Sequence, residues 1–351
     1  MSYLSLVVDN NATRLAYIDS GAPSQAVPEP YIILFAFHGM GFSSPTFKRL
    51  HALAPSANLR FVSVNRRGYA GSTPFSSAEY AIPASGSEDE KTAFFKARGI
   101  EAATFIDKFV QQNDIPPISS DGRSGGIGLL GWSAGNGVTL SVVAHLDELP
   151  SQTQARFVSH LRAVIMYEPP SVILGLPRPK ETWMPHLDES IPKHLRPAMW
   201  TPWVSAYFKH GDLSTRNWGA ISYIVPSITR APSVYNMSLD EIAEGVEETV
   251  DELLHFYYGV QQEHAIYRKA CFDRTLRALV PRMKVTHLCG DETCSPTIAA
   301  FFNVQEDAEV EGGGLVNFHL ISGANHFMHW DRPEETLQAC LIALELRQPS
   351  S

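Results

Sequence analysis

The stretch Gly126-Ile127-Gly128-Leu129-Leu130-Gly131-Trp132-Ser133-Ala134-Gly135-Asn136-Gly137 decides the fold. Its apolar first part leads into a turn of the form Gly-x-Ser-x-Gly, and a helix-like run, residues 138–146, follows at once. A serine at the apex of a sharp strand-to-helix turn is a nucleophile elbow, for which Gly131 and Gly135 leave the necessary room. The short pattern also occurs by chance, but a strand before it and a helix after it exclude most such accidents. The stretch therefore predicts that Ser133 is a nucleophile.

The overall composition indicates a globular protein that acts on a small molecule. The chain has 351 residues, of which 44% are hydrophobic, and its formal net charge is -9. This suits one large unit, or a core with an inserted subdomain. A nucleic-acid-binding protein normally has a basic face, and the acidic balance favours a small neutral or apolar substrate instead.

The sequence contains no recognisable targeting segment or metal motif. The N-terminal residues lack the pattern of a signal peptide, and no apolar run reaches the roughly 18 residues of a membrane span. We therefore expect a cytoplasmic protein without a membrane span. The cysteines form no Cys-x-x-Cys pair, and no histidine cluster has the spacing of a zinc site, so we expect free thiols, no metal and no cofactor. They are Cys271, Cys289, Cys294 and Cys340. The sequence does not indicate the oligomeric state.

Short apolar runs alternate with helical patterns along the chain, which predicts a mostly parallel eight-stranded sheet with helices on both faces. The predicted strands are residues 3–8, 14–19, 31–37, 59–64, 127–130, 162–167, 284–289 and 318–321. The predicted helices are residues 45–54, 91–113, 138–146, 238–258 and 333–346. Residues 74–90 have the composition of a polar loop.

The pattern changes in residues 169–275, where prolines are frequent and aromatic residues are concentrated. An aromatic-rich helical insertion between core strands predicts a cap over the active site. Its helix 238–258 begins at Ser238-Leu239-Asp240-Glu241, which matches a capping box. Residues 1–168 and 276–351 then form the core.

Two further groups are expected beside Ser133. Glycines in the segment 38–42 directly follow a buried strand and let the backbone approach a ligand closely. We expect the N–H groups of Met40 and Ala134 to stabilise an oxyanion, with Gly39 beside them. A serine needs a base, and His326 follows the last predicted strand at loop distance.

The acid that orients His326 has two candidates. The usual position lies after the seventh strand, but the register Gly290-Asp291-Glu292-Thr293 places Thr293 there, and threonine cannot carry the charge. Asp291 is near but out of register. Glu168 directly ends a buried strand, where an unpaired carboxylate would be costly. Pairing with a histidine would explain its presence, so Glu168 is favoured and Asp291 is the second choice.

These residues resemble those of the α/β-hydrolase superfamily. The segment 323–327 is similar to the family's Gly-x-x-His-aromatic loop, and the whole chain resembles a capped serine hydrolase with the α/β-hydrolase fold. A glutamate after the sixth strand, with no acid after the seventh, is similar to a subgroup that includes fungal zearalenone-type lactone hydrolases. That resemblance implies a Ser133-His326-Glu168 triad. It does not extend to the longer cap, so it does not carry over a substrate.

The leading hypothesis is a serine hydrolase that cleaves an ester or lactone of a bulky apolar substrate through an acyl-enzyme. A carbon–carbon hydrolase, a thioesterase or a cyclase would use the same triad. Epoxide hydrolases and dehalogenases are disfavoured because they have aspartate where this chain has Ser133. A non-catalytic binding protein on the same fold is a third hypothesis, although such proteins commonly lose a triad member.

Overall fold

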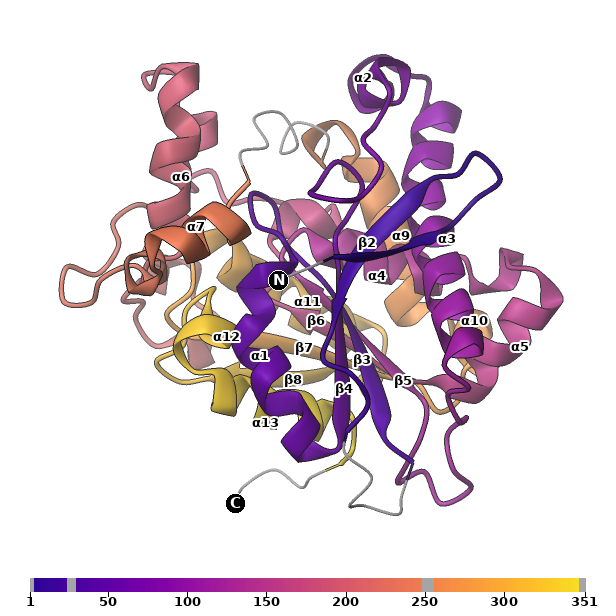
Figure 1. The fold of residues 1–351 in the computed structure, drawn as a ribbon. Coiled ribbons are helices and arrows are strands. Elements are labelled where there is room, and N and C mark those ends of the chain that lie inside the picture. Colours follow the sequence, from indigo (N-terminus) through magenta and orange to yellow (C-terminus); the bar gives the residue numbers. More distant parts are fainter. Residues whose placement is uncertain (1–2, 24–29, 248–255, 347–351) are drawn as a thin grey trace.

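The structure is a computed structural model that describes residues 3–23, 30–247 and 256–346. Its centre is an eight-stranded sheet with the order β1-β2-β4-β3-β5-β6-β7-β8 (Figure 1). Strand β2 is antiparallel to both of its neighbours, and the other neighbouring pairs are parallel. The strands are β1 (Leu4–Val7), β2 (Arg14–Asp19), β3 (Ile32–Phe37), β4 (Leu59–Val64), β5 (Ile127–Trp132), β6 (Leu161–Tyr167), β7 (Lys284–Gly290) and β8 (Asn317–Ile321). The eight predicted strands are confirmed, with ends displaced by at most two residues.

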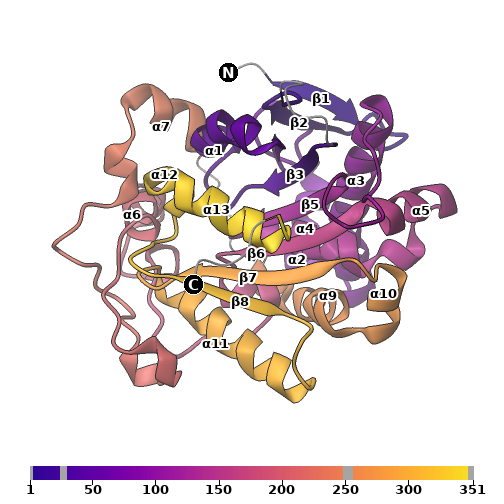
Figure 2. The ribbon, with the colours of Figure 1, turned by 90° about the horizontal axis from the view of Figure 1, so that it is seen from below.

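Helices cover both faces of the sheet, as predicted. Helices α1 and α13 pack together on one face, while α3, α4, α9 and α11 lie on the other (Figures 1 and 2). The helices are α1 (Lys48–Leu53), α2 (Ser77–Ser85), α3 (Glu88–Gln112), α4 (Gly135–Ala144), α5 (Ser151–His160), α6 (Arg196–Val204), α7 (Leu239–Gly245), α9 (Val260–Phe272), α10 (Arg274–Leu279), α11 (Ser295–Val310), α12 (Met328–Asp331) and α13 (Pro333–Ala343).

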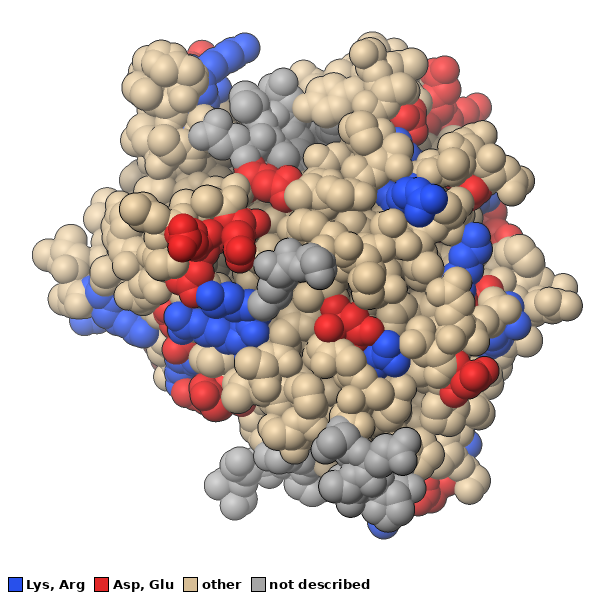
Figure 3. All heavy atoms as spheres, in the orientation of Figure 1, with Lys and Arg blue, Asp and Glu red and all other residues tan. Residues whose placement is uncertain are grey.

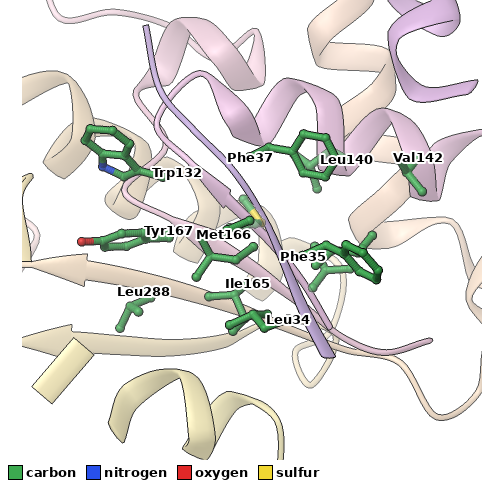
Figure 4. Packing of buried hydrophobic residues seen from close by; sticks show 14 of the residues in the cluster. Leu34, Phe35, Phe37, Trp132, Leu140, Val142, Ile165, Met166, Tyr167 and Leu288 are labelled. Carbon is green, nitrogen blue, oxygen red and sulfur yellow. The ribbon is translucent and has the colours of Figure 1, made fainter. Parts of the chain in front are cut away.

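The core explains why the central strands are unbroken apolar runs. Alternate residues of a strand point to opposite faces, so Phe37 lies beside Leu140 of α4, while Leu34 lies with Ile165 on the opposite side (Figure 4). Phe35, on the same face as Phe37, packs against Phe105 and Phe109 of α3. All six residues of β3 are buried. A parallel strand that is covered on both faces must be apolar throughout.

Strand register brings four loops to one edge of the sheet. Phe37 is paired with Gly131, and Tyr167 is paired with both Trp132 and Leu288. Because β3, β5, β6 and β7 are parallel, the loops after them leave at the same edge. In open α/β sheets, ligands bind outside the carboxyl ends of the strands.

The prediction of a polar loop at residues 74–90 is wrong. Helix α2 lies there, and α3 begins at Glu88 rather than at Lys91. Both helices start with a capping box, in which the side chain of Ser76 or Ser87 accepts a hydrogen bond from the N–H three residues later. Such a box supplies partners to helix-start amides that would otherwise lack them. This local signal outweighed the polar composition.

The predicted helix 238–258 begins as expected, because Ser238 and Glu241 form a capping box. Helix α7 nevertheless ends at Gly245, and Val246 turns extended to form a β-bridge with Phe42. Pairing with a distant segment therefore overrides the helical sequence pattern. Residues 248–255 of this prediction lie outside the described residues.

In its described residues, 168–247 and 256–259, the segment between β6 and α9 contains short 3-10 turns together with α6 and α7, which lie at one side of the molecule (Figure 1). Helix α9 packs against α3 and α4 on the face of the sheet. The limits of a cap at residues 169–275 stay a prediction. The face in Figure 3 carries basic and acidic side chains interspersed. In the part of the chain that the structure describes, no helix is long and apolar enough to cross a membrane.

Candidate active site

Ser133 lies between β5 and α4 at the apex of a sharp turn. Its φ of 52° is in the left-handed region, which is strained for a residue with a side chain. A hydrogen bond from Ser133 N to Tyr167 O, 2.9 Å long, holds this backbone in place. A Cβ on Gly135 would lie 2.0 Å from Phe37 O, so only glycine fits on the helix side of the turn. The predicted strand, turn and helix around Ser133 are therefore present.

The loop of residues 38–43, here called the oxyanion loop, passes directly over Ser133. A Cβ on Gly39 would lie 2.9 Å from Ser133 Cβ, so this approach requires glycine. Met40 lines a cavity together with Ser133 and Ala134. Within the described residues, the backbone N–H groups of Met40 and Ala134 have no hydrogen-bond partner. Both amides are thus placed where an oxyanion could accept hydrogen bonds from them.

Arg66 and Tyr69 hold the oxyanion loop from the side of the core. Arg66 donates from Nε to His38 O at 2.9 Å and from Nη2 to Gly39 O at 3.0 Å, and Gly41 N donates to the Tyr69 hydroxyl at 3.0 Å. Burial, together with the nearby Arg66, holds the pKa of His38 well below its ordinary value, so its ring is neutral. His38 Nε2 accepts from Arg66 N–H at 3.0 Å, so Nδ1 carries the proton toward Gly39 O.

The other end of the oxyanion loop is held by the segment that follows α7. Ser43 N donates to Gly245 O at 2.9 Å, and Glu247 N donates to Gly41 O at 3.0 Å. With the β-bridge described above, these bonds make a short antiparallel pairing. The loop is therefore supported by Arg66 and Tyr69 on one side and by the segment that follows α7 on the other.

Glu168 contacts His326 in a fully buried site. Glu168 Oε2 lies 2.9 Å from His326 Nδ1, and the side chain of Glu168 has no exposed surface. The carboxylate also accepts hydrogen bonds from Gly290 N and from the Thr293 hydroxyl. Like Ser133, Glu168 has a left-handed backbone, with a φ of 54°. A carboxylate at this position accepts a hydrogen bond from Nδ1, and this contact selects the imidazole tautomer in which Nε2 is the acceptor.

The second candidate for the acid has a different partner. Asp291 Oδ1 accepts a hydrogen bond from Gly323 N at 2.6 Å, which holds the loop between β8 and His326. Thr293 lies at the position where the acid was expected, and it donates to Glu168 instead. The structure therefore brings Glu168 to His326 and directs Asp291 to a backbone amide.

Trp132 and His329 form the buried support behind His326. Trp132 Nε1 donates to His326 O at 3.0 Å, and its ring packs against both histidines. His329 N–H donates to the Tyr167 hydroxyl at 3.1 Å, and His329 Nδ1 lies 2.9 Å from the same oxygen. Burial and nearby positive charge hold the pKa of His329 well below its ordinary value. His329 is therefore a neutral packing residue.

Two cavities lie beside the turn that carries Ser133 and share lining residues. The smaller, the serine cavity, has a volume of about 30 Å³ and is lined by Ser133, His326 and apolar side chains that include Met184, Trp200 and Val204. The larger, the deep cavity, has a volume of about 270 Å³ and is lined by residues that include Phe37, Phe95, Arg98, Ala134, Gly137 and Glu263. Ala134 and Phe256 line both cavities. The deep cavity thus lies directly behind the residue that carries one of the candidate oxyanion donors.

The sequence pattern did not indicate that Arg66, Tyr69 or Glu263 belongs to the site, and it indicated for Thr293 only that this residue cannot be the acid. Residues 66–72 follow a buried strand, and an arginine at such a strand end was the signal for support of a neighbouring loop. Among the described residues, no group of three or more His, Cys, Asp or Glu is arranged to hold a metal ion. Each of the four cysteines is a buried free thiol.

Glu263 should make the stability of the protein depend on pH. Burial raises the pKa of its carboxyl from 4.5 to about 8, although the Arg66 charge acts in the opposite direction. Between these values the native carboxyl keeps its proton while the unfolded chain releases it. The free energy of unfolding should therefore fall by up to about 1.4 kcal/mol for each pH unit.

The measurement is urea unfolding of the native protein and of Glu263→Gln at pH 5.5 and pH 7.5. We expect the stability difference between the two proteins to shift by about 2 kcal/mol in favour of the variant at the higher pH. Other titrating groups cancel in this comparison. Equal pH dependence of the two proteins would contradict a protonated Glu263.

Comparison with known proteins agrees with this architecture. The sequence pattern of the alpha/beta hydrolase family matches residues 33–339. No curated protein sequence matches the chain. Among solved structures, Cfl2 from Burkholderia cenocepacia is 15% identical with a TM-score of 0.52, covering 97% of this chain and 94% of its own. A carboxylesterase of the thaumarchaeon Nitrososphaera gargenis is 13% identical with a TM-score of 0.51, covering 98% of each chain.

A third structure, the thioesterase domain from the curacin biosynthetic pathway, is 13% identical with a TM-score of 0.51 and covers 97% of this chain and 100% of its own. At such identities, these similarities concern the fold alone. The family pattern, in contrast, spans most of the sequence, including the oxyanion loop, Ser133, Glu168 and His326. The chain belongs to the α/β hydrolase family.

Proposed function

We propose that the protein is a serine hydrolase that cleaves a carboxylic ester or lactone through an acyl-enzyme. The observation that supports this most directly is the 2.9 Å contact between His326 Nδ1 and Glu168 Oε2, in a buried site that opens on Ser133. A serine at the elbow, a histidine beside it and a carboxylate behind the histidine are the parts needed to activate a hydroxyl group.

Acylation begins when Ser133 Oγ attacks the carbonyl carbon of the substrate. His326 Nε2 takes the hydroxyl proton, and Glu168 stabilises the imidazolium that forms, because its oxygen accepts the Nδ1 proton in a hydrogen bond. The carbonyl oxygen becomes an oxyanion and accepts hydrogen bonds from the N–H groups of Met40 and Ala134. His326 then gives its proton to the leaving alkoxide, and the acyl group remains on Ser133.

Deacylation repeats these steps with water. His326 accepts a proton from water as the water oxygen attacks the acyl carbon, and it returns that proton to Ser133 Oγ when the acid leaves. Glu168 must stay ionised throughout. Hydrogen bonds from Gly290 N and the Thr293 hydroxyl hold the side chain of Glu168 in place beside His326.

For the substrate we propose a bulky apolar ester or lactone. The serine cavity is lined on the side of the inserted segment by Met184, Trp200 and Val204, and the deep cavity adds further aromatic walls. Apolar walls with a few placed polar groups are typical of small-molecule sites. A glutamate after β6 as the acid is also the feature in which the chain resembles zearalenone-type lactone hydrolases, and macrolactones therefore belong in the first substrate panel.

The test combines a fluorophosphonate probe with a panel of aryl esters and macrolactones. An activated Ser133 should react covalently with the probe, and mass spectrometry of the peptides should place the label on this residue. The variant His326→Ala should be labelled far more slowly, because it lacks the base. A native protein that hydrolyses no ester and leaves Ser133 unlabelled would instead be a binding protein on the hydrolase fold.

A further inference from the structure

The deep cavity shares a wall with the serine cavity at Ala134. Ala134 lines both cavities and follows Ser133 directly, so a group in the deep cavity lies against the backbone of the elbow. Its volume of about 270 Å³ exceeds that of the serine cavity several times over. At roughly 30 Å³ for each water-sized group, it has room for an aromatic ring system with a substituent.

Most charged groups around the deep cavity have partners within its wall. Arg67 and Arg98 form ion pairs with Glu101, at 3.1 Å and 2.6 Å, and Arg67 also pairs with Glu79. The guanidinium group of Arg66 holds the oxyanion loop. The three arginines therefore have hydrogen-bond or ion-pair partners within the protein.

Glu263 is different because its carboxyl group has no such partner. It extends from α9 over the start of α4, where a Cβ on Gly137 would lie 3.1 Å from its Oε1. Only 2% of Glu263 is exposed, and its Oε2 is buried without a hydrogen-bond partner. Leaving a buried polar group unpaired costs about 1–3 kcal/mol, so such a group points to a missing partner.

We propose that the deep cavity is a substrate subsite and that Glu263, as a neutral acid, donates a hydrogen bond to a carbonyl or ether oxygen on an aromatic-sized part of the substrate. This inference rests on the proposed function for the reaction itself. It narrows the substrate class to esters or lactones whose apolar part carries a hydrogen-bond acceptor. The raised pKa of Glu263, about 8, agrees with a protonated donor at neutral pH.

Glu263 is then a specificity-determining residue that binds a part of the substrate remote from the reacting carbonyl group. Aromatic side chains such as Phe37 and Phe95 would contact the ring faces, while Glu263 selects for one oxygen. A site built around a buried donor disfavours an analogue without the matching acceptor, because the donor then stays unpaired.

The experiment measures binding of two ligands of the same shape, 2-acetylnaphthalene and 2-isopropenylnaphthalene, by calorimetry at pH 6.5. The ratio of their dissociation constants is compared among the native protein, Glu263→Met and Glu263→Gln. Methionine keeps the length of the side chain without a donor, and glutamine keeps an N–H donor. We expect the preference for the ketone to fall about tenfold in Glu263→Met and to be retained largely in Glu263→Gln.

Two further readouts separate this inference from the proposed function. At pH 9.5 the native carboxylate has lost its donor, so the ketone preference should fall in the native protein but not in Glu263→Gln. The ketone should also compete with aryl ester substrates in the native enzyme. Equal ligand ratios in all three proteins, or a ketone that binds without competing with a hydrolysed ester, would overturn the subsite. Ketone selectivity that depends on Glu263, in a protein that hydrolyses no ester, would support the donor while refuting the proposed reaction.

Discussion

Ser133→Ala should lower kcat for aryl ester hydrolysis by about 10⁵-fold or more, down to the level of the uncatalysed reaction plus residual oxyanion binding. The variant keeps the Met40 and Ala134 amides but has no oxygen to attack the carbonyl carbon. Ser133→Gly should be equally inactive. Glycine adopts a φ of 52° without the cost of about 1 kcal/mol that a side chain incurs there, so this variant should also unfold at a higher urea concentration.

The measurement is kcat for aryl ester hydrolysis by the purified native protein and its variants. Their urea unfolding midpoints check that the fold is intact. A matched control is Ser141→Ala, which removes another buried serine hydroxyl from α4, one that bonds to Phe95 O. That variant should lose about 1 kcal/mol of stability and keep its activity. Turnover by Ser133→Ala within a hundredfold of the native protein would refute nucleophilic catalysis by this residue.

Glu168→Gln should lower kcat by about 10³- to 10⁴-fold, whereas Asp291→Asn should change it by less than about tenfold. One carboxylate oxygen of Glu168 accepts from Gly290 N, and the other accepts from Thr293 and His326. Glutamine must place its NH₂ group on one side. The backbone N–H of Gly290 cannot become an acceptor, whereas the Thr293 hydroxyl can rotate and His326 can change tautomer, so the NH₂ group should turn toward His326.

That orientation reverses the tautomer of the imidazole. His326 Nδ1 would then accept a hydrogen bond and Nε2 would carry the proton, so the ring could not accept the proton of Ser133. Asparagine at 291, in contrast, keeps the oxygen that accepts from Gly323 N. The kcat values of the two variants, with urea unfolding as a check on the fold, decide between the acids. A large loss in Asp291→Asn together with near-native turnover in Glu168→Gln would reverse the assignment.

The parts of the site that could be predicted depend on local sequence. The elbow carries its own signals, because a tight turn needs small neighbours and a buried parallel strand must be apolar. The geometry that separates Glu168 from Asp291 could not be predicted in this way. That geometry depends on the pairing of Tyr167 with Leu288, which brings the ends of β6 and β7 together and places the Thr293 hydroxyl where it donates to Glu168.

Features that depend on contacts between distant segments were missed for the same reason. Glu263 belongs to a helix whose sequence, with neighbouring glutamines and a histidine, resembles a solvated surface. Only the packing of α9 over Gly137 buries its carboxyl. Helix α7 likewise ends early because Val246 finds a strand partner in Phe42, about two hundred positions away in the sequence.

The pairing of Gly41 and Ser43 with the end of α7 bears on how the protein could be re-engineered. If the segment that contains α7 only covered the site, it could be replaced by the corresponding segment of another hydrolase without effect on the oxyanion loop. Here an exchange would also remove the hydrogen bonds to Gly41 and Ser43, which lie in the loop that carries the Met40 amide. A grafted insertion must therefore supply its own extended residues opposite this loop. Substrate range and catalytic rate would otherwise change together, because the same few hydrogen bonds serve both.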